Sequence, residues 1–155
     1  MNKKITNYFS MIGLILVILA LTTCDNGTTS SHNDFERRVF ELTNVERRKQ
    51  GISALRWDNR LGAAARAHSE DMARNSFMSH TGSDGSSVGT RITRAGFTWR
   101  SAAENIAAGQ RTPEAVISSW MRSPGHRANI LNQNLTHLGV GFANNRWTQK
   151  FATPR

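Results

Sequence analysis

The chain has 155 residues, which is enough for one domain, and it carries a formal net charge of +9 at pH 7. The many arginines are scattered along the chain, and no basic motif interleaved with aromatic residues accompanies them, which argues against a nucleic-acid-binding protein. We expect these arginines to lie on solvated faces; attraction to an anionic surface is the alternative. A single cysteine excludes an internal disulfide bond.

The first 23 residues have the pattern of a secretory signal peptide. Two lysines precede an apolar run over residues 11–21, which is too short for a comfortable membrane-spanning helix. The segment LTTC, ending at Cys24, resembles a bacterial lipobox, although Thr23 stands where such a motif usually has Gly, Ala or Ser. This resemblance predicts lipidation of Cys24, and therefore an exported lipoprotein anchored to a membrane and facing the periplasm or the cell surface. Cleavage elsewhere, which gives a secreted protein, is the alternative.

The chain after the signal peptide (residues 1–23) divides into a linker and one folded domain. Residues 24–33 hold the lipidated cysteine and a polar stretch, and residues 34–155 show neither an internal repeat nor a second domain. Because Cys24 is the only cysteine, no catalytic thiol lies within this domain. A packed core must therefore stabilise the domain, and about 120 residues can form one without covalent cross-links.

Two helices are predicted at the start of the domain. Asn33 or Asp34 can cap a helix whose apolar residues recur every three or four positions, and Gly51 ends it. Asp58 caps a second helix, on which His68 lies in an apolar stripe. A histidine in such a stripe is more often a core residue with a hydrogen-bonded ring than a ligand, and we interpret His68 in this way.

A loop rich in Ser and Gly is predicted over residues 76–89. We expect Phe77 and Met78 to anchor this loop in the core and to leave His80 at its rim. A short helix over residues 90–96 follows the loop.

The second half of the domain contains one strong helix start and one hairpin. Thr112, followed by Pro113, begins a helix that has Trp120 on its buried face. Residues 138–142 and 147–152 are predicted to be strands joined by a hairpin turn. Several helices around a short, mostly antiparallel sheet predict an α+β domain.

Three polar residues form the one constellation in the sequence that could carry chemistry. His80 lies in the Ser/Gly loop, Glu104 in the apolar run AENIA, and His126 in a Pro-Gly turn. Two converging imidazoles can hold a divalent cation, Zn²⁺ or Ca²⁺, with a position left open for water. A carboxylate between them could orient an imidazole, take a proton from bound water, or bind the ion directly. A structural role is also open, in which Glu104 bridges the two histidines by hydrogen bonds.

Six segments occur in order over residues 35–154: LTNVERRKQGISALRWDNRLGAAARAHSEDMA, FMSHTG, AENIA, AVISSWMRSPGHRANIL, HLGVGFA and WTQKFATP. Together they resemble the CAP superfamily (cysteine-rich secretory, antigen 5 and pathogenesis-related proteins, with an SCP domain), and more closely its compact bacterial members. The resemblance implies an α-β-α sandwich. It also implies a surface cleft that carries two His and two Glu in many members.

Matched by motif, the resemblance places His80, Glu104 and His126 in this cleft. Ser123 stands where animal and plant members usually have the second Glu, which removes a negative charge and should weaken divalent cation binding. Ser123 also raises the hypothesis of a serine hydrolase together with His126 and Glu104. We interpret it instead as the cap of a short helix that starts at Pro124.

Three neighbours of the cleft are given structural roles. We expect Asn105 to tie down backbone beneath the cleft and Trp120 to pack between a helix and the sheet. Arg127 is interpreted as a solvated residue or as the partner of a carboxylate.

Two functions of different classes follow from these features. The first, which we favour, is an extracytoplasmic, lipid-anchored binding module whose His/Glu cleft takes a small hydrophobic molecule, an envelope glycan or a protein partner. The second is metal-assisted hydrolysis of a peptide or glycan, with His80 and His126 holding the ion and Glu104 acting as general base. A nucleic-acid ligand is a distant third, because it rests on charge alone.

Overall fold

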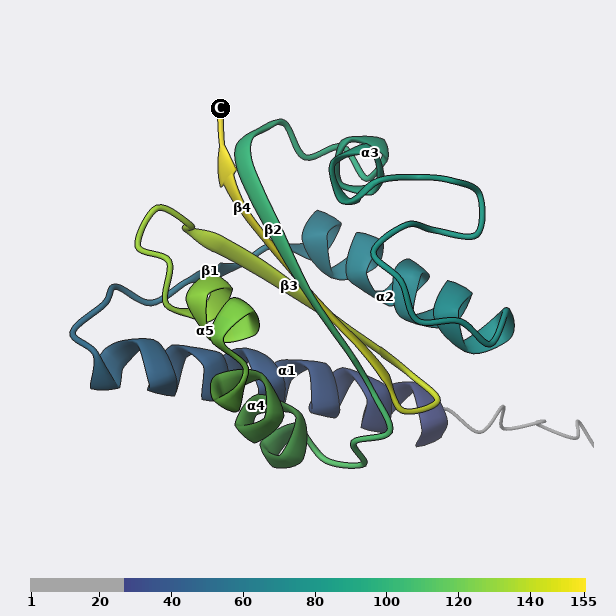
Figure 1. Cartoon of the computed structure of the whole chain (residues 1–155), viewed down its shortest axis with the longest axis horizontal. Helices are drawn as coiled ribbons and strands as arrows, with labels where there is room; N and C mark the ends of the chain where they lie inside the picture. Colours follow the sequence, from purple (N-terminus) through teal and green to yellow (C-terminus); the bar gives the residue numbers. More distant parts are fainter. Residues whose placement is uncertain (1–26) are drawn as a thin grey trace, which may run out of the picture.

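A four-stranded mixed sheet lies at the centre of the computed structural model, which describes residues 27–155 (Figure 1). The strands are β1 (Arg56–Trp57), β2 (Trp99–Ala108), β3 (His137–Ala143) and β4 (Arg146–Pro154). Their spatial order is β1-β3-β4-β2; β1 runs parallel to β3, and the other pairs are antiparallel. The predicted hairpin is confirmed, because β3 and β4 are joined through Asn144 and Asn145, whose positive φ angles suit a tight turn.

Helices cover both faces of the sheet (Figure 1). One face carries α1 (Gly27–Lys49), α4 (Pro113–Arg122) and α5 (Pro124–Ile130), and the other carries α2 (Asn59–Arg74) and α3 (Val88–Arg94). This arrangement confirms the predicted α+β fold with an α-β-α sandwich. No helix within residues 27–155 has the length and apolar character needed to cross a bilayer.

Each face of the sheet has its own apolar core. The larger core joins α1, α4 and α5 to the sheet through residues such as Val39, Trp120 and Phe151. The smaller core lies under α2 and α3 and includes Leu61 and Ile92. Buried aliphatic and aromatic side chains of this size contribute roughly 1.5–3 kcal/mol each, so the larger core supplies most of the apolar stabilisation.

Strand β3 packs unusually close to α2 because two of its residues lack a side chain. A Cβ atom on Gly139 would lie 2.0 Å from the backbone nitrogen of Gly62, and one on Gly141 would lie 2.2 Å from the backbone of Ala65. Real Cβ atoms do not approach so closely, so helix and strand are in direct backbone contact. This contact fixes the height of α2, and therefore of His68, above the sheet.

The local signals at most element boundaries are confirmed. Asp58 caps α2 by accepting hydrogen bonds from the backbone of its first turn, and Thr112 caps α4 by accepting from Ala115. Gly51, with φ of 68°, follows the end of α1.

Three details differ from the sequence-based expectations. Helix α1 begins at Gly27, earlier than the predicted cap at Asn33 or Asp34, because its first turns precede the apolar stripe that marked the helix. Met78 is 43% exposed, so only Phe77 of the predicted anchor packs inward, beside His68. Strand β2 was not predicted, because its alanine-rich sequence contains only one β-branched residue, Ile106. The predicted signal peptide and lipidation of Cys24 lie outside the described residues.

Candidate functional site

Glu104 lies on β2 and is the centre of the candidate site. The residue is only 6% exposed, and it lies on the face of the sheet that α2 and α3 cover. Lys150 is its register partner on β4, and the Lys150 ammonium group donates to Glu104 Oε2. Arg91 on α3 donates from Nη2 to the same oxygen over 3.1 Å and to Oε1 over 3.3 Å. Two inward-facing cations therefore hold one carboxylate.

Two histidines approach the other carboxylate oxygen of Glu104. His80, in the loop between α2 and α3, donates from Nδ1 to Oε1 over 2.7 Å, and its side chain remains 54% exposed. His68, on α2, places Nε2 at 3.9 Å from Oε1. His68 Nε2 also lies 3.0 Å from the backbone oxygen of Ser79 and must donate to it, because a carbonyl only accepts. Residues from β4, α2, α3 and a loop thus converge on Glu104.

The charges of this cluster follow from burial and from the neighbouring groups. Burial raises the pKa of the Glu104 carboxyl, but the charge and hydrogen bond of Lys150, with the hydrogen bond of His80, bring that pKa below its usual value. Burial lowers the pKa of Lys150 to about 8, against the opposing effect of Glu104. Burial also lowers the pKa of His68. Near pH 7 the cluster therefore contains an ionised Glu104–Lys150 pair and a neutral His68.

The site extends across the outer edge of β2 onto α5, which lies on the opposite face of the sheet. Asn105 donates from Nδ2 to the backbone oxygen of His126 over 3.1 Å, and Asn129 donates to the backbone oxygen of Glu104 over 3.3 Å. The His126 imidazole is half-buried and makes no hydrogen bond within residues 27–155. Burial is the main cause that lowers the pKa of His126, and the charge of His80 lowers it further.

The structure brings only some of the predicted site residues into contact. His80 donates a hydrogen bond to Glu104, but no hydrogen bond within residues 27–155 joins Glu104 to His126, so the open alternative in which Glu104 bridges the two histidines does not hold. Ser123 occupies the N-cap position of α5 before Pro124, as predicted, yet its side chain makes no capping hydrogen bond. Its hydroxyl has no hydrogen bond to His126 in the described part of the chain, so nothing there activates it as a nucleophile.

The roles predicted for the neighbouring residues are confirmed. Asn105 is fully buried and ties β2 to the backbone of α5. Trp120 is buried between α4 and the sheet, and its indole donates to the backbone oxygen of Ile106 over 3.2 Å. Arg127 is exposed and forms no ion pair with any residue of 27–155, so it is solvated.

Sequence reasoning missed three members of the cluster. Lys150 lies in the strand WTQKFAT between Gln149 and Phe151, and this mixed sequence gives no clear signal that the lysine is buried against a partner. Arg91 gave no such signal, because it lies on a short helix and does not differ in sequence from the solvated arginines. His68 was correctly predicted to be a buried histidine with a bonded ring, but its approach to Glu104 depends on the tertiary packing of α2.

The donor set does not fit a resident divalent cation. Within residues 27–155, no three His, Cys, Asp or Glu side chains are grouped so that they could hold a metal ion. Glu104 is the carboxylate of the site, and the charges of Lys150 and Arg91 beside it repel a cation. Only His80 and His126 would then remain as ligands, whereas zinc sites use at least three protein ligands.

Comparison with known proteins gives consistent matches. The family model for the cysteine-rich secretory protein family (CAP) matches residues 40–153. Protein YkwD of Bacillus subtilis (strain 168) is 43% identical over 132 residues, which are 84% of this chain and 51% of that protein. The chain therefore spans about half the length of this relative.

Solved structures agree with the fold. A Bacillus anthracis structure, described as an extracellular protein containing an SCP domain, superposes with a TM-score of 0.77 at 36% identity, over 78% of this chain and 41% of that chain. An outer surface protein of Borrelia burgdorferi superposes with a TM-score of 0.72, over 79% of this chain and 94% of that chain. Because its identity is 19%, that likeness shows the fold alone.

Proposed function

Because the chain belongs to the cysteine-rich secretory protein (CAP) family, we propose that it is an exported binding module whose ligand occupies a cleft beside Glu104, lined by His80, His126 and Ser123. Export is supported by the predicted signal peptide and by the Bacillus anthracis relative, which is described as extracellular. Anchoring through a lipid on Cys24 is part of the proposal.

The observation that supports a binding role is that both carboxylate oxygens of Glu104 already accept hydrogen bonds. A general base needs a free lone pair directed at its proton and a pKa near the working pH. Glu104 instead accepts hydrogen bonds from Lys150, Arg91 and His80, and its pKa is lowered. This arrangement suits a carboxylate that orients His80, and it gives no support to the alternative of metal-assisted hydrolysis with Glu104 as base.

The charges beside the cleft favour an anionic group on the ligand. Lys150 and Arg91 together outweigh the single charge of Glu104, and the whole chain is strongly basic. His80 Nδ1 is occupied by Glu104, which leaves Nε2 to contact the ligand on its exposed side. The ligand we propose is therefore an acidic component of the cell envelope, such as a peptide that ends in a free carboxylate.

An NMR titration tests this proposal with two matched peptides. N-acetylated tetra-alanine with a free C-terminal carboxylate is compared with the same peptide capped as an amide, and the imidazole resonances of His80 and His126 are followed. We expect saturable shifts with the free peptide only, and a loss of at least about tenfold in affinity for His126→Ala. His137→Ala removes a half-buried histidine outside the cleft and should bind as the parent does.

Equal shifts with the two peptides would show that the anionic group is not recognised. If a peptide shifts other resonances but leaves the imidazole resonances of His80 and His126 unchanged, the ligand binds elsewhere, and the role of the cleft is overturned. If neither peptide shifts any resonance, the proposed ligand class is wrong.

A further inference from the structure

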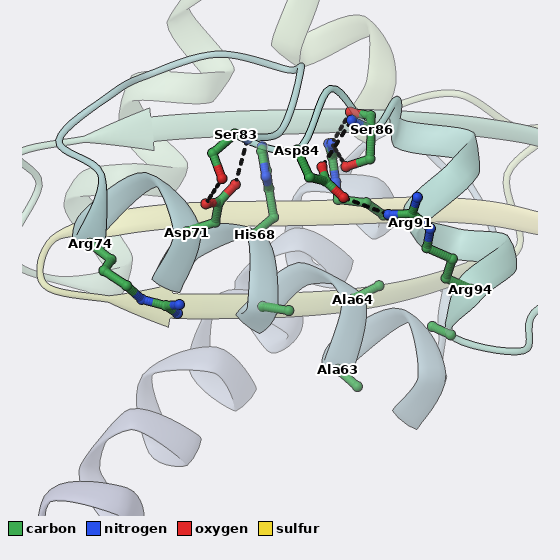
Figure 2. Close-up of a pocket in the computed structure, with 12 residues that line it drawn as sticks. Ala63, Ala64, His68, Asp71, Arg74, Ser83, Asp84, Ser86, Arg91 and Arg94 are labelled. Atoms are coloured by element: carbon green, nitrogen blue, oxygen red, sulfur yellow. Dashed lines mark hydrogen bonds and ion pairs between the residues drawn. The ribbon is translucent and has the colours of Figure 1, made fainter.

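A pocket lies on the face of the sheet covered by α2 and α3, and Figure 2 shows its lining. It has a volume of about 460 Å³, which falls in the size range of small-molecule sites. One wall is formed by small residues of α2, including Ala63 and Ala67. The opposite side is formed by polar residues of α3 and of the loop between α2 and α3, among them Asp84 and Arg94. His80, His126 and Ser123 do not line this pocket, so it is separate from the proposed cleft.

Two buried polar atoms at this pocket have no partner within residues 27–155. His68 is 1% exposed; its Nε2–H is used by Ser79, which leaves Nδ1 as an unpaired acceptor. The second atom is Nε of Arg91, an unpaired donor. In Figure 2 the His68 imidazole rises from α2 between the Asp71–Ser83 pair and Asp84. Buried polar groups are nearly always hydrogen-bonded, so this pair points to a ligand.

The remaining donors of Arg91 are already committed. Nη1 donates to the backbone oxygen of Ser86 over 2.6 Å, and Nη2 donates to the backbone oxygen of His80 and to Glu104. Arg91 therefore has one hydrogen bond left to give, through Nε, and His68 has one left to accept, through Nδ1.

Most of the charged groups that line the pocket already have a hydrogen-bonding or ionic partner. Arg94 donates to Asp84 over 2.6 Å, and Asp71 accepts hydrogen bonds from Ser83 and Asn75. Arg91 is paired with Glu104. Arg74 is the one charged residue of the lining that has no partner within residues 27–155. Paired charges of both signs favour a neutral ligand over a free cation or anion.

We propose that this pocket binds a neutral polyhydroxylated molecule, such as a sugar ring. A hydroxyl group both donates and accepts, so one hydroxyl can donate to His68 Nδ1 and another can accept from Arg91 Nε–H. The alanine wall offers an apolar surface for the C–H face of the ring. Both unpaired atoms lie beneath the pocket surface, so the proposal requires the loop segment over residues 83–86 to move outward when the ligand enters.

This inference goes beyond the proposed cleft function and does not depend on it. Arg91 nevertheless contacts both sites, because it bonds the backbone of His80 and the carboxylate of Glu104. A sugar in the pocket is therefore expected to shift the His80 resonances only weakly, whereas it shifts those of His68 directly.

The test is an NMR titration with glucose and with N-acetylglucosamine, each up to about 100 mM to cover weak binding. We expect saturable amide shifts in α2, α3 and the loop between them, together with an upfield shift of His68 Nδ1 as it accepts a hydrogen bond. Ala67→Trp places an indole in the pocket from an exposed helix position and should weaken binding at least about tenfold.

The matched control is Ala115→Trp, which adds the same indole to an exposed position of α4 outside this pocket. It should bind sugar as the parent chain does. Saturable shifts that persist in Ala67→Trp, a His68 Nδ1 resonance that does not move, or no shift with either sugar would each overturn the proposal. Because Ala67→Trp leaves the cleft intact, its peptide titration should be unchanged, which separates a failure here from a failure of the cleft function.

Discussion

Glu104 and Lys150 are register partners on adjacent antiparallel strands, and they form an ion pair on the face of the sheet that α2 and α3 cover. Both side chains are almost completely shielded from water. An ion pair in such a place is stabilising only while both partners are present, because either charge alone would be buried without compensation. The pair therefore holds the Glu104 carboxylate in one position, and the hydrogen bond from His80 to this carboxylate orients the imidazole.

The first prediction concerns removal of the charge of Glu104. Glu104→Gln leaves Lys150 buried without its counter-charge, so the free energy of unfolding should fall by about 3–5 kcal/mol. Urea denaturation measures this change, and adding Lys150→Met should recover part of it. Glu114→Gln is the control. Glu114 forms an exposed ion pair with Arg38, so its replacement should change the free energy of unfolding little. A loss of less than about 1 kcal/mol for Glu104→Gln would mean that the pair is not a structural element.

The second prediction is a loss of stability in acid. The pKa of Glu104 is lower in the folded chain than its usual 4.5, so its contribution is present above pH 4.5 and is lost as pH falls through the folded value. The pKa of His68 is also lowered, from 6.5, so below pH 6.5 the unfolded chain binds the proton more readily and stability falls. Urea midpoints between pH 7 and pH 5 should therefore decrease less in His68→Gln than in the parent chain. An identical decrease in the two chains would assign the effect to other groups.

The third prediction is weak binding of divalent cations. Calorimetric titration of the metal-stripped chain with Zn²⁺ and Ca²⁺ should give no saturable binding at about micromolar concentration, because Lys150 and Arg91 neutralise Glu104. The same titrations of His80→Ala and His126→Ala complete the test. Saturable binding in the parent that disappears in both variants would establish a metal site and would justify assays of hydrolysis.

The fourth prediction compares two helix caps. Thr112 accepts a hydrogen bond from the backbone of Ala115, so Thr112→Ala should cost about 1 kcal/mol of stability. Ser123 occupies the equivalent position of α5 without a side-chain hydrogen bond, so Ser123→Ala should change stability by less than about 0.5 kcal/mol, as substitutions without special contacts do. Thermal denaturation of the two variants measures the difference. Equal losses would show that Ser123 caps α5 in solution.

The parts of the fold that could be predicted are those with local causes. Asp58, Thr112 and the pair Asn144–Asn145 determine the backbone around themselves through short-range hydrogen bonds or permitted φ values, so their roles were visible in the sequence. Met78 was predicted wrongly because an apolar residue in a loop can be left exposed when its neighbour, Phe77, takes the inward position.

The candidate site was predictable only in its outline. His80 and Glu104 could be named from motifs, but the groups that set the charge of Glu104 are brought in by three separate elements. Register between β2 and β4 places Lys150 opposite Glu104, and no short-range pattern encodes that register. The cationic surroundings that disfavour a metal ion therefore appear only after the tertiary structure is known.

The edges of the sheet have a consequence for chains held close together on a surface. Strand β2 is a long edge strand, and such edges invite pairing with another molecule. Here the outward carbonyls of Glu104 and Ile106 already accept hydrogen bonds from Asn129 and Trp120, while β1, at the opposite edge, has only two residues. Neither edge offers a neighbouring copy a continuous row of free carbonyl groups. Copies of this domain are therefore not expected to polymerise strand to strand when they are concentrated.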